Sequence, residues 1–235
     1  MTGRREVDLG SVVLSVVEHP GPLDGGVPAV LLPGTGLTAR SWDAVAGSLS
    51  ATRRVVAVDL RGHGASEWPG AYSIAVMARD VAALLDELGE LGVLDEGRVD
   101  LVGHSLGGLV ALRVAAARPD RVRRLVLEDV GMPHPRRPSA PARPEGELDF
   151  DWRVVEQVRP EVDDPDPSWP RVVTSVVAPT LVVAGGPSSF VPAEHVAELV
   201  AALPDGRSVT LDTGHEVHHV DPDGFVREVR AFLDA

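Results

Sequence analysis

The sequence lacks lysine, cysteine and asparagine altogether, and it contains a single tyrosine and a single glutamine. Without lysine, Schiff-base enzymes and P-loop phosphate sites are excluded. Without cysteine, the chain has no thiol nucleophile, no thiolate metal site and no disulfide framework. The missing asparagine also excludes N-glycosylation. A catalytic nucleophile must therefore be Ser, Thr, Asp, Glu, His or the single Tyr.

The charge and hydropathy of the chain limit its partners. All 22 basic residues are arginine and the formal net charge is −13, which argues against binding to nucleic acid. No run approaches the ~18 consecutive apolar residues that a membrane span needs, and the N-terminal residues do not resemble a targeting signal. We therefore expect a cytoplasmic protein whose 235 residues form one domain, 1–235.

The hydrophobic pattern alternates short β-branched runs with helical periodicity. The expected strands are 11–18, 29–32, 54–59, 99–102, 125–128, 180–184 and 208–211, and the expected helices are 41–49, 74–88, 106–117, 192–203 and 222–233. Strands followed by helices predict right-handed crossovers and an α/β fold with an open, mostly parallel sheet of about eight strands and helices on both faces. The first two strands have no helix between them, so we expect them to form an antiparallel edge pair.

The segment 131–170 interrupts this alternation, because it holds nine of the 20 prolines. Proline at this density predicts mostly irregular structure, with one short helix over 149–158. We interpret the segment as a reduced, proline-rich excursion across the top of the sheet.

The motif Gly103-His104-Ser105-Leu106-Gly107 follows an expected strand and opens an expected helix. It matches the pattern G-x-S-x-G, in which the serine occupies a strained turn that lifts its hydroxyl out of the sheet. The amino end of the following helix favours negative charge that develops on an oxyanion. Ser105 is therefore the candidate nucleophile.

With this motif, the chain resembles the α/β-hydrolase superfamily. The segment 30–42 looks like that family's oxyanion loop, the segment 59–66 looks like its loop after the next strand, and Gly214-His215 looks like its histidine loop. The resemblance implies that the backbone N–H groups of Thr35 and Leu106 form an oxyanion hole. Pro33 stands where the family usually has histidine, and we expect this to alter the support of the loop more than the chemistry.

A serine nucleophile needs a general base, and His215 is the candidate among the eight histidines. His215 follows the last expected strand, from which a short loop can reach Ser105. His218 and His219 complete a histidine cluster, but metal ligands at this spacing need a helix and these residues are expected in a loop. We therefore predict polar structural contacts for both and no metal or cofactor.

The acid of the triad is expected at an unusual place. The family usually supplies it after the strand 180–184, where this chain has Ser188, and a hydroxyl cannot hold an imidazolium as a carboxylate does. A subset of the family takes the acid from the end of the preceding strand, which here carries Glu128 and Asp129. We predict Asp129 as the acid, with Glu128 as the alternative.

The function expected from these residues is hydrolysis of an ester or related acyl bond of a small molecule by a carboxylesterase-like serine hydrolase. Trp152 and Phe190 are candidates to contact the substrate, although such aromatic residues also pin loops to a core. A non-hydrolytic member of the same fold, such as a cyclase, lyase or ligand-binding protein, is the main alternative. A weaker one is a nicotinamide-dependent oxidoreductase, because the segment 34–39 reads G-x-G-x-x-A and Asp59 ends the next strand.

Overall fold

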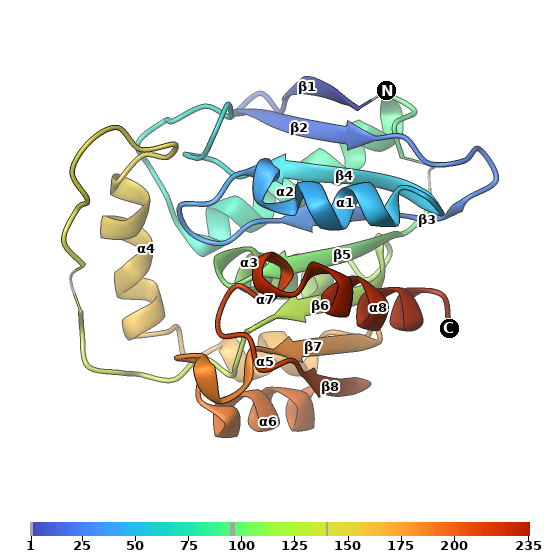
Figure 1. Cartoon of the computed structure of the whole chain (residues 1–235). Helices are drawn as coiled ribbons and strands as arrows, with labels where there is room; N and C mark the ends of the chain where they lie inside the picture. The colour runs from blue at the N-terminus through green and yellow to red at the C-terminus, as the bar shows by residue number, and fades with distance from the viewer. Residues whose placement is uncertain (1, 95–96, 140) are drawn as a thin grey trace.

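The computed structural model describes residues 2–94, 97–139 and 141–235 (Figure 1). Within them, one sheet contains eight strands in the order β1-β2-β4-β3-β5-β6-β7-β8. The strands are β1 (Gly3–Asp8), β2 (Val13–His19), β3 (Gly26–Leu32), β4 (Arg53–Asp59), β5 (Val99–His104), β6 (Val122–Glu128), β7 (Thr180–Ala184) and β8 (Gly206–Thr210). The helices are η1 (Ala39–Trp42), α1 (Asp43–Leu49), α2 (Ile74–Glu90), α3 (Leu106–Ala117), α4 (Arg153–Asp163), α5 (Trp169–Thr174), η2 (Gly186–Ser188), α6 (Ala193–Ala202), α7 (Val217–Val220) and α8 (Pro222–Leu233).

The α/β architecture with a mostly parallel sheet is confirmed. All neighbouring pairs from β4 across to β8 are parallel, and only the pairs β1–β2 and β2–β4 are antiparallel. The central strands β5 and β7 are buried at every position. This agrees with their continuous apolar sequence, because helices cover both faces of a parallel sheet.

The predicted pairing of the first two expected strands is wrong. β2 pairs with β4 on one side and with β1 on the other, while β3 lies between β4 and β5. β3 is apolar on both faces and therefore belongs inside the sheet, where both faces are covered. β1 was not expected because its sequence GRREVD buries only Val7. Its charged side chains suit an exposed edge, where they discourage pairing with another chain.

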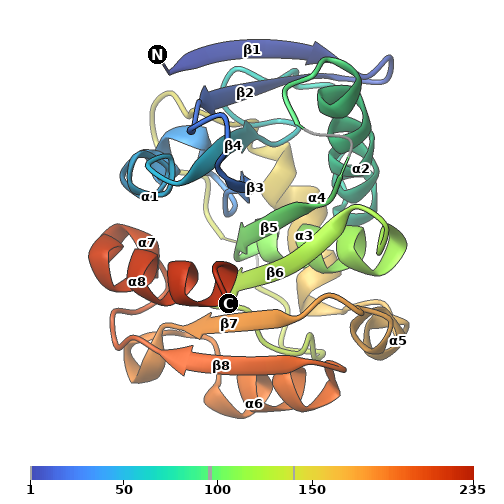
Figure 2. The ribbon, with the colours of Figure 1, turned by 90° about the vertical axis from the view of Figure 1, so that its right-hand side faces the viewer.

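Helices cover the two faces of the sheet in separate layers (Figure 2). On one face, α1, α7 and α8 enclose a core that contains Trp42 and Phe225. On the other face, α2, α3 and α6 enclose a larger core that contains Met77 and Leu84. In the part of the chain that the structure describes, no helix has the length and apolar character that crossing a membrane requires.

The proline-rich segment between β6 and β7 contains two helices rather than one. The helix expected over 149–158 begins and ends later, as α4, and it continues through Pro160. The second helix, α5, was not expected because Trp169 and Pro170 lie at the end of the proline-rich run. Figure 1 shows α4 beyond the carboxyl ends of the parallel strands. It is tied there by hydrogen bonds from Gly64 N to Asp149 O (2.7 Å) and from Asp151 N to Gly62 O (2.8 Å).

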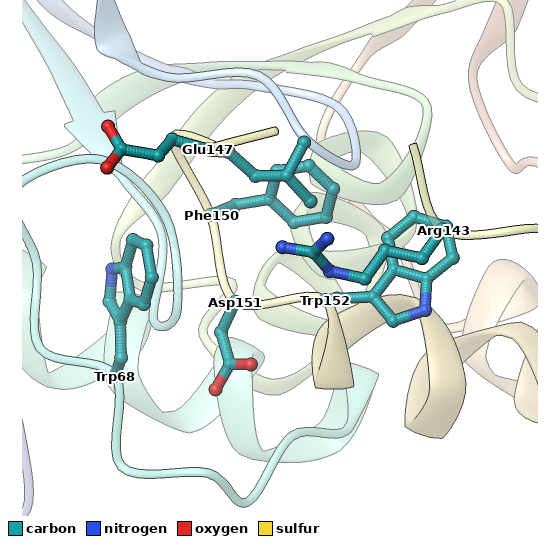
Figure 3. A pocket seen from close by; sticks show the side chains of 7 residues that line it. Trp68, Arg143, Glu147, Phe150, Asp151 and Trp152 are labelled. Carbon is teal, nitrogen blue, oxygen red and sulfur yellow. The ribbon is translucent and has the colours of Figure 1, made fainter. Parts of the chain in front are cut away.

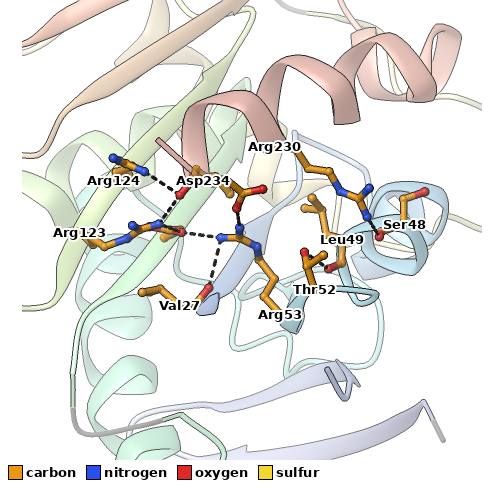
Figure 4. A network of polar contacts seen from close by, with 11 residues as sticks. Val27, Ser48, Leu49, Thr52, Arg53, Arg123, Arg124, Arg230 and Asp234 are labelled. Atoms are coloured by element: carbon orange, nitrogen blue, oxygen red, sulfur yellow. Dashed lines mark hydrogen bonds and ion pairs between the residues drawn. The ribbon is translucent and has the colours of Figure 1, made fainter. Parts of the chain in front are cut away.

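A polar network closes the opposite end of the sheet (Figure 4). The buried Asp100 carboxylate on β5 accepts hydrogen bonds from Arg53 on β4 (2.9 Å) and from Arg123 on β6 (2.6 Å). Arg53 also pairs with Asp234, and both Arg123 and Arg124 donate to the carbonyl of Leu233. The end of the C-terminal helix α8 is therefore attached to β4 and to β6, far from the carboxyl ends where α4 stands.

Candidate active site

Ser105 lies in a strained turn between β5 and α3, as its motif predicts. Its φ of 50° is in the left-handed region that non-glycine residues rarely adopt. A Cβ on Gly103 would lie 2.4 Å from the carbonyl oxygen of Gly107, and a Cβ on Gly107 would lie 2.4 Å from that of Leu32. Both glycines are therefore required for the close backbone packing that raises Ser105 above the sheet.

Asp129 is held at the carboxyl end of β6 by three hydrogen-bond donors. Like Ser105, it has a positive φ, 49°. Oδ1 accepts the backbone N–H of Gly185 (2.8 Å), and Oδ2 accepts the hydroxyl of Ser189 and lies 2.6 Å from His215 Nδ1. The carboxylate is 1% exposed, so these donors replace water around it. Neither Gly185 nor Ser189 was expected as a donor, because both lie more than 50 residues from Asp129 in sequence and no local pattern marks such a contact.

His215 is brought to Asp129 by the short loop after β8. Gly214 has a φ of 87°, and its N–H donates to Gly185 O (2.9 Å), which turns the chain back toward β6. Because a carboxylate only accepts, the 2.6 Å contact places the hydrogen on His215 Nδ1 and leaves Nε2 as the basic nitrogen. The exposed ring of Phe190 lies 4.1 Å from the His215 ring, centroid to centroid.

His104, the residue before Ser105, connects the nucleophile turn with the backbone of the histidine loop. Its Nε2 donates to the carbonyl of His215 (2.9 Å), which links the nucleophile turn to the backbone of His215. Burial lowers the pKa of His104 to about 4, so its ring is neutral near pH 7. The elements that carry Ser105, Asp129 and His215 thus meet at the carboxyl ends of β5 and β6.

The segment expected to supply the oxyanion hole lies against the nucleophile turn. The backbone turns from Gly34 to Leu37 through a hydrogen bond of 3.1 Å, with Gly36 at a φ of 78°. A Cβ on Gly34 would lie 2.6 Å from His104 Nδ1 and 3.4 Å from the Cβ of Ser105. Thr35 follows Gly34, and Leu106 is the first residue of α3, where backbone N–H groups have no partner within the helix.

Glu128 contacts His218 rather than His215. Both carboxylate oxygens lie 2.8 Å from His218 Nδ1, and the two side chains are fully buried. The expectation that His218 and His219 fall in a loop is wrong, because both belong to the short helix α7. Even so, the described residues contain no group of three or more His, Cys, Asp or Glu side chains arranged to hold a metal ion.

Trp152 and Phe190 occupy different surroundings. Trp152 lines a hollow of about 420 Å³, shown in Figure 3 together with Trp68, Arg143 and Phe150. Phe150 also reaches the oxyanion segment, since a Cβ on Gly36 would lie 3.1 Å from its ring. Phe190, by contrast, lies on the ring of His215. The hollow therefore adjoins the site on the side of α4, and Phe190 borders it on the side of the loop after β7.

The residues that resemble a dinucleotide fingerprint have another role. Asp59, which would face a ribose hydroxyl in a nicotinamide-binding protein, is fully buried. Its carboxylate accepts the N–H of Ala39 (2.7 Å) and pairs with Arg4 (2.7 Å). Asp59 thus fastens the loops around β4 and has no face free for a cofactor.

Residues 29–173 match the family model described as the alpha/beta hydrolase family. The chain belongs to the alpha/beta hydrolase family. Among its relatives, an esterase of Mycobacterium tuberculosis is 43% identical over 45% of this chain and 34% of the relative. A 2-hydroxymuconate semialdehyde hydrolase of Pseudomonas putida is 44% identical over 43% of this chain and 36% of the relative. The first curated relatives are matched over only 30% of their own length.

Solved structures of alpha/beta hydrolases share the whole fold. The crystal structure of E-2-(acetamidomethylene)succinate hydrolase superimposes with a TM-score of 0.82 at 23% identity, covering 100% of both chains. The enol-lactonase from Burkholderia xenovorans LB400 superimposes with a TM-score of 0.82 at 24% identity, covering 98% of this chain and 100% of the other. At these identities, the likeness supports the fold and says nothing of the substrate.

Proposed function

We propose that this alpha/beta hydrolase is a serine hydrolase that cleaves an ester or related acyl bond of a small molecule. The observation that carries the proposal is the 2.6 Å contact between His215 Nδ1 and Asp129 Oδ2 at the same sheet edge as the strained Ser105 turn. A nucleophile, a base and an orienting acid at one edge are the parts that acyl transfer requires. Relatives named as an esterase and a hydrolase support this reading.

In the proposed reaction, Ser105 Oγ attacks the carbonyl carbon while His215 Nε2 takes the hydroxyl proton. Asp129 keeps the proton of His215 on Nδ1 and stabilises the imidazolium that forms. The imidazolium then gives its proton to the leaving group, and an acyl-enzyme remains on Ser105. Water, deprotonated by His215, attacks this ester, and the acid product leaves with Ser105 restored.

The oxyanion of both tetrahedral intermediates would accept the backbone N–H groups of Thr35 and Leu106. Leu106 begins α3, so the helix dipole adds to its N–H. In known enzymes, removing one such donor costs about 10²–10³ in kcat. The substitution of histidine by Pro33 leaves these backbone donors in place, since proline removes only its own N–H.

The hollow beside α4 is the proposed place for the substrate. Its lining combines the faces of Phe150 and Trp152 with the cationic Arg143, as Figure 3 shows. A volume of about 420 Å³ falls within the range of small-molecule sites, roughly 300–1,000 Å³. We therefore propose a small acyl substrate rather than a polymer.

The proposal is tested by labelling the protein with a fluorophosphonate, which reacts with activated serines. We expect wild-type protein to label and to hydrolyse chromogenic esters, and Ser105→Ala to do neither. Ser11→Ala is the matched control, because Ser11 is exposed in a turn of the edge strands. A panel of esters varied in acyl length then identifies the preferred acyl group.

Labelling that persists in Ser105→Ala would show that another serine reacts. A wild-type protein that neither labels nor hydrolyses any ester of the panel would instead favour a non-hydrolytic member of the family.

A further inference from the structure

Glu128 and His218 form a second carboxylate–histidine pair beneath the proposed triad. Glu128 is the last residue of β6, and its Oε1 also accepts the backbone N–H of His218 (2.9 Å). When Glu128 is ionised its carboxylate only accepts, so the 2.8 Å contacts then place the hydrogen of His218 on Nδ1. The side chains of both residues have zero exposure, so the geometry of the pair is set by packing.

The pair is enclosed by aromatic rings that hold His218 in one orientation. The Trp42 ring stacks on His218 with centroids 4.0 Å apart, and the Phe225 ring meets it edge-on at 6.2 Å. His104 approaches from β5, its ring centroid 5.2 Å from that of His218. Within the described part of the chain, His218 Nε2 has no hydrogen-bond partner, so Glu128 supplies all of the polar contact that its ring receives.

Glu128 also contacts the segments that carry the three residues of the proposed triad. Its carbonyl accepts the N–H of Ser105 (3.1 Å), and the next residue in the chain is Asp129. Through its side chain it fixes His218, three residues after His215. A residue with these connections transmits any displacement to the nucleophile, the acid and the base together.

We propose that Glu128 is a positioning residue of the proposed reaction: its bonds to His218 fix the segment that carries His215, and its buried charge favours the imidazolium formed on His215. The inference rests on the proposed function, since it assigns a role relative to that triad. It differs from the alternative in which Glu128 is the triad acid, because the His215 ring contacts Asp129 and not Glu128.

The charge of Glu128 depends on pH near neutrality. Burial raises the pKa of Glu128 to about 7, and burial lowers the pKa of His218 to about 4. The titratable groups that face Glu128 are His104 from β5, His215 and His218 from the segment after β8, and Asp129 beside it. His104 and His218 are thus neutral at pH 7, and Glu128 carries an uncompensated negative charge only above about that pH.

The first test is Glu128→Gln, which keeps the shape and one acceptor oxygen but removes the charge. We expect kcat to fall about tenfold to 100-fold with little change in KM. Gln replaces one of the two oxygens that contact His218 Nδ1 with an amide NH2, and it removes the charge that favours the imidazolium on His215. The ratio of wild-type to variant kcat should grow as pH rises from 5.5 to 8.5, since wild-type Glu128 gains its charge over this range. Glu198→Gln is the matched control, because Glu198 contacts His134 (2.6 Å) and both side chains are exposed.

A second variant separates positioning from stability. In Glu128→Leu/His218→Leu, both partners become apolar, an exchange that is often neutral for a buried pair. The backbone N–H of residue 218 loses its acceptor, which destabilises the fold. We therefore expect a lower melting temperature and, in protein assayed below it, a reduced kcat. A double variant with wild-type kcat, or a wild-type to Glu128→Gln ratio that is constant with pH, would overturn the proposal.

The experiment also distinguishes this inference from the proposed function. Wild-type protein that labels with a fluorophosphonate, while Glu128→Gln and the double variant retain full activity, refutes the role of Glu128 alone. Wild-type protein that neither labels nor hydrolyses esters refutes the proposed function itself.

Discussion

Gly185 offers a direct test of whether the packing between β7 and the histidine loop controls activity. A Cβ at this position would lie 2.0 Å from the carbonyl oxygen of Gly214 and 3.1 Å from Asp129 Oδ1. Ordinary contacts begin at 3.4 Å, so Gly185→Ala forces the Gly214 backbone to move by more than 1 Å. Gly214 precedes His215, and the N–H of Gly185 itself binds Asp129. The substitution therefore displaces both His215 and Asp129, the proposed base and acid.

A displacement of 1 Å at a catalytic group costs about 10²-fold in rate, which corresponds to ~2.7 kcal/mol in the activation barrier. Overpacking of this kind destabilises a fold by roughly 1–3 kcal/mol. We expect kcat/KM on a chromogenic ester to fall about 100-fold in protein that is still folded by circular dichroism at the assay temperature.

The matched control is Gly47→Ala, because a Cβ on Gly47 has nothing within 4 Å. Gly47 lies on the exposed side of α1, so alanine should preserve activity and stabilise the fold by about 0.5–1 kcal/mol. If Gly185→Ala retains wild-type kcat/KM, the histidine loop tolerates the displacement and the reasoning from its backbone contacts is refuted.

Three further substitutions test other parts of the structure. Asp129→Asn should lower kcat on esters about 10³- to 10⁴-fold, as the loss of the orienting carboxylate does in triads; an unchanged kcat would place the acid elsewhere. Asp80→Ala leaves the buried Arg61 without its bidentate partner (2.6 and 2.7 Å) and should cost about 3–5 kcal/mol, measured by urea unfolding. Burial opposes ionisation of Asp163, but donors from Ser139, Arg136 and Arg159 outweigh it and lower the pKa to about 2 from 3.8. Its stabilisation relative to Asp163→Asn, about 2 kcal/mol, should be present above pH 3.8 and disappear as the pH falls toward 2; a difference that does not change over that range would contradict this.

The sequence predicted the architecture because the parallel core strands and their helices carry strong local signals. Continuous apolar runs and 3.6-residue periodicity are local signals that do not depend on tertiary contacts. The strands near 99–104 and 180–184 and the helix near 106–117 were therefore placed within two residues. The order of the first strands was not predictable in the same way. β2 and β3 are close in sequence but do not pair with each other, because β2 lies between β1 and β4 while β3 lies between β4 and β5. The edge belongs to β1, whose charged sequence carries no strand signal.

The residues of the candidate site could be proposed from the sequence, but their supporting contacts could not. Ser105, His215 and Asp129 were proposed from motifs and strand ends, which can be recognised in the sequence alone. The donors to Asp129 come from Gly185 and Ser189, more than 50 residues away in sequence, and no local pattern marks them. The same holds for the contact between Glu128 and His218, which lie 90 residues apart.

The proposed place of the acid at the end of β6 has a consequence for the engineering of this protein. With the acid on β6, the loop after β7 does not have to supply a charged catalytic group. Two anchors in this loop, Gly185 and Ser189, donate hydrogen bonds to Asp129. Pro187, Ser188 and the exposed Phe190 beside His215 can vary without removing a residue of the proposed triad, whereas Gly186 is restricted by its φ of 71°. A combinatorial library confined to residues 187, 188 and 190 would therefore change the surface that borders His215 while the proposed triad stays intact.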